Sequence, residues 1–189
     1  MPKTRPNTWC RLRHVEQLEP RRLLAFDLAV IDATVTNANV EPSQLTVFPD
    51  SATLNGVLYF SDTDPRHGRE LHAVNLETGT RTRFDVNPGF DDSHPFRITA
   101  AGDWLVFYAL DPLRGGELRW IDTSAEPHTV QTLDVRPGIG ESKAGRYGFG
   151  VVDDYLFFSA TRGSGQSAEL HWLDMAAAKP TLHTIPAWT

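Results

Sequence analysis

The stretch "HGRELHAVNLETGT" at residues 67–80 recurs twice in altered form, and this recurrence decides the fold. The later versions are "RGGELRWIDTSA" at 114–125 and "QSAELHWLDMAA" at 166–177. Their shared Glu-Leu pair therefore returns after 47 residues and again after 52. Apolar triplets stand 12 or 13 residues before these pairs: "LYF" (58–60), "LVF" (105–107) and "LFF" (156–158). Landmarks in fixed order at a nearly constant interval indicate three repeat units within residues 44–189, at about 44–87, 96–135 and 147–186.

Each unit has the signals of four short antiparallel strands. In "FRITAAGDWLVFYAL" (96–110) two β-type runs flank Gly102-Asp103, a pair suited to a tight hairpin. A polar loop, the run that begins with Glu-Leu, a second turn and a fourth run follow. The first two units then end in "DVNPG" (85–89) and "DVRPG" (134–138), 49 residues apart. Because β-branched and aromatic residues are frequent and Gly and Pro interrupt the chain, a helical repeat is disfavoured.

Hydrophobic patterning predicts how these strands pack. The run "WLVFYAL" (104–110) and its counterpart "YLFFSA" (155–160) are apolar on both faces, so we expect a sheet on each side of them. The expected core residues are Leu105, Phe107, Leu156 and Phe158. The "ELRWID" and "ELHWLD" runs alternate, which predicts outer strands with Arg119, His72 and His171 on an exposed polar face. The predicted fold class is all-β, with antiparallel four-stranded blades of the β-propeller-like type.

Counting the units gives about three blades, whereas closed propellers use about four to eight. The predicted structure is therefore open or incomplete, with apolar end surfaces that favour self-association. Residues 26–43 read as a linker, in which "FDLAVIDATVTN" (26–37) is a candidate edge strand. Residues 1–25 lack the repeat pattern and read as a separate segment.

Two stretches resemble known families. "LEPRRLL" (18–24) is similar to the LEPR-XLL amino-terminal motif of large planctomycete proteins, which implies a sorting segment at 1–25 and an extracellular or cell-surface location. "LYFSDTDPRHGRELHAVNLETGT" (58–80) resembles the ELWxxDGT repeat of large bacterial surface proteins. The tryptophan of that pattern falls on His72, Arg119 and His171 here, and the family brings no catalytic residues to transfer.

Composition excludes several function classes. The chain has 189 residues, of which 40% are hydrophobic, and no apolar run reaches the roughly 18–20 residues of a membrane span. Residues 1–25 carry six basic and two acidic side chains, a net charge of +4. Since the whole chain has a net charge of −6, residues 26–189 carry a net charge of −10. A body of that charge repels phosphate backbones, and no nucleic-acid partner is expected. Cys10, the single cysteine, supports neither an internal disulfide nor a zinc site.

Candidate catalytic and metal residues are sparse. Asp62, Asp64 and Glu70 offer oxygen ligands for calcium, but the later units do not repeat the set, which favours solvated turn carboxylates and a strand-start glutamate. The histidines show no metal-ligand spacing, and no serine has a nucleophile context. We therefore expect no enzyme activity, no cofactor and no metal.

The sequence predicts an exported non-catalytic repeat protein with a structural or interaction role at the cell surface and a protein or glycan partner. The alternative is a carbohydrate- or peptide-binding propeller, with a degenerate enzyme as one form of it. That alternative would use the loops after the fourth strands, whose polar residues are Asp91, Asp92, His94, Arg136, Glu141 and Lys143. A sugar-stacking surface of Trp104, Trp120 and Trp172 is the less favoured reading, since repeated tryptophans usually belong to the core.

Overall fold

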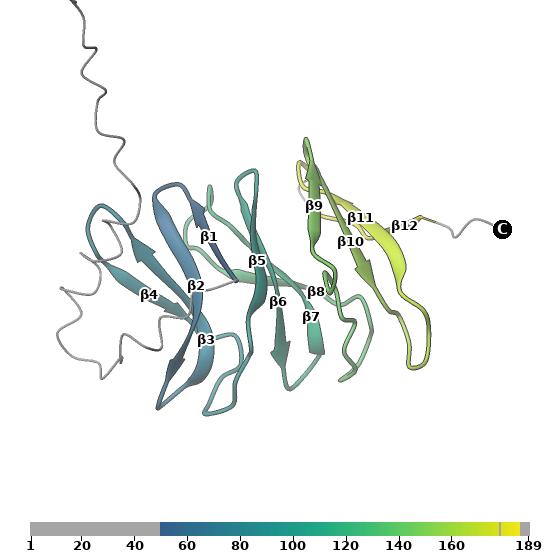
Figure 1. Cartoon of the computed structure of the whole chain (residues 1–189), viewed down its shortest axis with the longest axis horizontal. Coiled ribbons are helices and arrows are strands. Elements are labelled where there is room, and N and C mark those ends of the chain that lie inside the picture. Colours follow the sequence, from purple (N-terminus) through teal and green to yellow (C-terminus); the bar gives the residue numbers. More distant parts are fainter. Residues whose placement is uncertain (1–49, 178, 186–189) are drawn as a thin grey trace, which may run out of the picture. The chain divides into compact units, whose positions relative to one another are not determined.

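The computed structural model describes residues 50–177 and 179–185, and these residues hold twelve β-strands and no helix (Figure 1). The predictions for residues 1–25 and 26–43 lie outside the described residues. The strands are β1 (Ser51–Leu54), β2 (Val57–Asp64), β3 (Gly68–Asn75), β4 (Arg81–Phe84), β5 (Phe96–Ala101), β6 (Trp104–Asp111), β7 (Gly115–Asp122), β8 (Val130–Leu133), β9 (Phe149–Val152), β10 (Tyr155–Ala160), β11 (Glu169–Asp174) and β12 (His183–Ile185). The described residues include no helix that is long and apolar enough to cross a membrane.

The strands form three antiparallel four-stranded sheets, each made of four consecutive strands in sequence order (Figure 1). We call β1–β4 the first blade, β5–β8 the second and β9–β12 the third. Each repeat unit is thus one sheet, as the spacing predicted, and within the described residues the sheets are not closed into a barrel. The first hairpin turns at Asn55-Gly56, where both residues have positive φ, as tight hairpins require.

Two hydrophobic clusters join the blades, and β6 contributes to both. Leu105 and Phe107 pack with Tyr59 of the first blade, whereas Val106 lies in the cluster that holds Leu156 of the third blade. Successive side chains of a strand point to opposite faces, so an apolar run with no polar position fits a sheet covered on both sides. The predicted core is confirmed, since Leu105, Phe107, Leu156 and Phe158 are at most 2% exposed.

The prediction of an amphipathic third strand is wrong. Arg119, His72 and His171 are only 3%, 4% and 0% exposed. Arg119 lies opposite Phe107 on the face toward the first blade, and His171 lies opposite Phe158 on the face toward the second. His72 lies on the other face of the first blade, where no described sheet packs, and is buried nonetheless. Each of the three side chains keeps at least one hydrogen-bond partner, which makes the burial of a polar group tolerable.

The expectation that "YLFFSA" is covered on both faces is also wrong. In β10, Leu156, Phe158 and Ala160 are buried against the second blade. Tyr155 and Phe157 alternate with them and stay partly exposed on the other face. Within the described residues no further sheet packs on that face, so an apolar surface remains.

Candidate functional site

Two similar segments lead from one blade to the next. They read "DVNPGFDDS" (85–93) and "DVRPGIGES" (134–142), and we call them connectors. Each ends in a fully buried serine, Ser93 in the first and Ser142 in the second. The sequence pattern used above covers only the first five residues of each connector, DVNPG and DVRPG, and does not include these serines. Their shared spacing of 49 residues was the signal that could have found them.

The glutamates of the first two Glu-Leu pairs each bind the connector that follows their own blade. Glu70 accepts hydrogen bonds from the Val86 amide at 2.8 Å and from the Ser93 hydroxyl at 2.7 Å. Glu117 accepts from the Val135 amide at 2.9 Å. Burial raises the pKa of Glu70, and it raises the pKa of Glu117 to about 7. These glutamates therefore hold the connectors in place.

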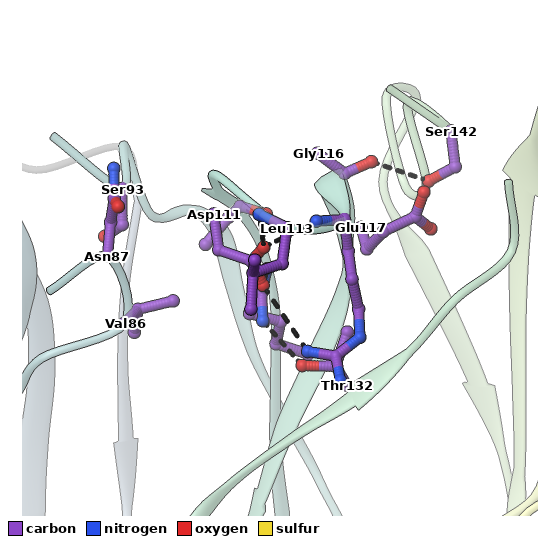
Figure 2. Close-up of polar contacts among 12 residues, drawn as sticks. Val86, Asn87, Ser93, Asp111, Leu113, Gly116, Glu117, Thr132 and Ser142 are labelled. Carbon is purple, nitrogen blue, oxygen red and sulfur yellow. Dashed lines mark hydrogen bonds and ion pairs between the residues drawn. The ribbon is translucent and has the colours of Figure 1, made fainter. Parts of the chain in front are cut away.

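The buried serines join successive blades through their backbone. Ser142 donates its amide to the Gly116 carbonyl at 2.8 Å, and its own carbonyl accepts from the Thr161 amide at 2.7 Å. Its hydroxyl also donates to the Gly116 carbonyl, at 3.0 Å (Figure 2). Ser93 repeats the two backbone bonds with Arg69 and Leu110. The connectors thus align one blade with the next.

Arg119 forms a buried ion pair between strands of the second blade. Its Nη2 lies 2.7 Å from Asp111 Oδ2, and its Nη1 donates to Thr132 Oγ1 at 2.5 Å (Figure 2). Burial alone would raise the pKa of Asp111. The hydrogen bonds from Arg119 and from the Arg114 and Leu113 amides outweigh burial and lower it. The ion pair between Arg119 and Asp111 compensates two charges that the packing of the blades shields from water.

The two repeat-equivalent histidines are also buried. Burial, followed by the charge of Arg81, lowers the pKa of His72 to about 4. Burial likewise lowers the pKa of His171, whose Nδ1 lies 3.0 Å from Thr184 Oγ1. Both side chains are neutral at physiological pH, so they fit a packing role better than acid–base chemistry.

The three carboxylates considered for calcium bind separate partners. Asp62 pairs with Arg81 at 2.5 Å, Asp64 lies 3.3 Å from Arg83, and Glu70 binds the first connector. Glu70 is fully buried rather than solvated. In the part of the chain that the structure describes, no group of three His, Cys, Asp or Glu side chains could hold a metal ion.

The three tryptophans do not share one surface. Trp104 and Trp120 stack at 5.4 Å between ring centroids and pack into the cluster between the second and third blades. Trp172 stacks on His183 at 4.0 Å. It lies opposite Phe157 in the sheet, on the face of the third blade that points away from the second.

The loop residues proposed for ligand binding separate into two groups. Asp91, Asp92 and His94 belong to the first connector region, where Asp92 pairs with His94 at 3.4 Å. In the second connector region, Glu141 and Lys143 border an open pocket of about 230 Å³. The sequence had not pointed to the other lining residues, which are Phe96, Tyr108 and Arg146. Arg136 does not line this pocket; its guanidinium donates to the Glu141 carbonyl at 3.1 Å.

The uncovered face of the third blade is apolar, and we call it the end face. Cross-strand pairing places Val152 beside Tyr155 and Ile185 beside Leu170. These four side chains are 59%, 41%, 39% and 46% exposed. With the partly buried Phe157 and Trp172 they form one contiguous apolar surface across four strands.

Comparison with known proteins finds no family model, no curated protein and no solved structure that matches this chain. The LEPR-XLL and ELWxxDGT resemblances therefore stay predictions.

Proposed function

We propose that this protein is an exported, non-catalytic repeat protein that acts by association at the cell surface. The end face carries the proposal. Its central residue, Phe157, corresponds to Tyr59 and Val106 in the other two blades, and both of those are 1% exposed beneath the following blade. A surface that the repeat buries twice and exposes once has the shape and chemistry for binding another sheet.

The proposed partner on the end face is a second copy of this chain. The opposite face of the first blade is not equivalent, because Arg81 covers the Phe60 ring at 5.6 Å and pairs with Asp62. Because the end face is the one open apolar face of this kind in the described residues, two copies meet through the same face and form a closed dimer rather than a filament. Four strands about 4.8 Å apart and about 17 Å long give roughly 300–400 Å² per copy. That is small for a specific interface, so we expect weak, concentration-dependent association.

Light scattering after size exclusion tests this proposal over a range of protein concentrations. We expect a monomer–dimer equilibrium that Val152→Ser combined with Leu170→Ser shifts to the monomer. Ile139→Ser is the matched control, because Ile139 is a large exposed side chain outside the end face, and it should leave the mass unchanged. A monomer at every concentration, or a dimer that ignores the double variant, would contradict the proposal.

The proposed location rests on a different observation. The resemblance of residues 18–24 to the LEPR-XLL motif supports export and an extracellular or cell-surface site. Fractionation of cells that produce the chain, with and without residues 1–25, tests it. Retention of both forms inside the cell would contradict it.

A second candidate function is carbohydrate or peptide binding at the loop end of the blades. The pocket beside the second connector favours it, because Glu141 and Lys143 meet there with two aromatic side chains. Titration with glycan and peptide panels tests this candidate independently of the dimer.

A further inference from the structure

The pocket beside the second connector is built by a departure from the repeat. Tyr108 occupies a position that holds serine in the other units, at Ser61 and Ser159. In the first blade, Ser61 accepts a hydrogen bond from Arg69 Nε at 2.8 Å. The residue equivalent to Arg69 in the second blade is Gly116. Two positions that interact in the first blade are thus changed together in the second.

The tyrosine and the glycine require each other. A Cβ atom on Gly116 would overlap the Tyr108 hydroxyl and ring, so only glycine leaves room for this phenol. The Tyr108 ring also packs edge-on against Phe96, with 5.6 Å between centroids. This paired change makes a strand position part of the pocket lining, with the aromatic ring and hydroxyl of Tyr108. The stacking of blades does not require this paired change, because the first blade stacks on the second with Ser61 at the position of Tyr108.

The polar lining of the pocket has an excess of positive charge. Lys143 and Arg146 face a single carboxylate, Glu141, and within the described residues neither cation forms an ion pair. Burial, followed by the charge of Glu141, raises the pKa of Tyr108, so the phenol stays protonated. Within the described residues the pocket therefore offers two cations without an ion pair, a neutral hydroxyl and one hydrogen-bond acceptor.

We propose that this pocket binds a sugar residue that carries a carboxylate, such as a uronic acid; the inference rests on the second candidate function. Lys143 and Arg146 hold the carboxylate, Glu141 and Tyr108 bind ring hydroxyls, and the aromatic walls contact the ring carbons. An acidic amino-acid side chain would engage the cations but offer no ring hydroxyl to Glu141. The volume of about 230 Å³ lies below the roughly 300–1,000 Å³ of drug-sized sites, which suits a single sugar ring.

Ligand-observed NMR titration with glucuronate, on the full chain, tests the inference. We expect saturable binding that weakens at high salt, because the ion pairs at this exposed rim are screened. Lys143→Asn and Arg146→Gln should each weaken binding at least tenfold. Asparagine is chosen because Lys143 has φ 54°, a left-handed conformation that asparagine tolerates.

The matched control is His94→Asn, which introduces the same residue at the equivalent position beside the first connector, where φ is 46°. It should leave glucuronate binding and melting temperature unchanged. Equal loss in His94→Asn, or no loss in Lys143→Asn, would overturn the proposed site.

Two further probes separate the possible sources of binding. Glucose that binds as tightly as glucuronate would overturn the acidic-sugar inference and leave carbohydrate binding standing. N-acetylaspartate that binds as tightly would show that the pocket recognises only a carboxylate, which also overturns the inference. If none of the three probes binds, the inference fails, and the glycan and peptide panels then decide the second candidate function separately.

Discussion

The buried carboxyl of Glu117 predicts a stability change of unusual sign. Its folded-state pKa is about 7, against about 4.5 when it is exposed. The native state therefore binds this proton more tightly than the unfolded state does. The stabilisation from Glu117 is complete below about pH 4.5 and is lost as the pH rises through about 7. A shift of this size corresponds to about 3 kcal/mol of unfolding free energy.

Other groups titrate over the same range, so a difference measurement is needed. His72 has the opposite effect: its pKa is lowered to about 4, so its contribution is lost as the pH falls. Glu117→Gln removes the carboxyl and leaves the histidines. We expect the unfolding free energy of the parent protein, minus that of Glu117→Gln, to fall by about 3 kcal/mol between pH 4.5 and pH 8.

Urea denaturation at several pH values measures this difference. The control is Glu169→Gln, because Glu169 is the equivalent glutamate of the third unit and its side chain is 49% exposed. Its difference curve should lack a fall of about 3 kcal/mol over this range. A Glu117 curve that also lacks this fall, or that rises with pH, would refute the reasoning from burial.

Four further substitutions test the packing by urea denaturation at pH 7. Leu105→Ala should destabilise the fold by roughly 2–5 kcal/mol, because Leu105 is fully buried between two blades, and a loss below 1 kcal/mol would place it outside the core. Arg119→Met should cost roughly 3–5 kcal/mol, because it removes the buried partner that lies 2.7 Å from the Asp111 carboxylate. Arg114→Met, at a side chain 48% exposed, should cost little, and similar losses at both arginines would contradict the assigned burial. Gly115→Ala should cost more than about 1 kcal/mol, since Gly115 has φ 69° and a Cβ would lie 2.5 Å from the Ile139 carbonyl oxygen; an unchanged midpoint would refute that close approach.

Sequence alone was sufficient for the blades. The spacing of the Glu-Leu pairs and apolar triplets predicted three units, and each unit is one four-stranded sheet. The apolar run at 104–110 predicted a strand covered on both sides, which β6 is. These features follow from local chemistry, because turn residues and side-chain alternation act over a few residues.

The polar residues of the third strands could not be placed in the same way. Glu117, Arg119 and His171 look like surface residues in sequence, yet all three are buried. Their burial depends on partners that lie far along the chain, such as the Val135 amide for Glu117 and Thr132 for Arg119. A periodic pattern shows which residues share a face, but not whether another sheet covers it.

The pocket and the end face also depend on the tertiary structure. The sequence contains Tyr108 and Gly116 eight positions apart, but only the pairing of β6 with β7 brings the phenol over the glycine. The triplets at 105–107 and 156–158 look equally apolar, yet Val106 is buried and Phe157 lies on an uncovered face. What the sequence determined is the repeating unit. The three units place equivalent residues at equivalent strand positions, but the number of stacked blades decides which of these residues are buried. Burial depends on the neighbouring sheet and not on the strand itself.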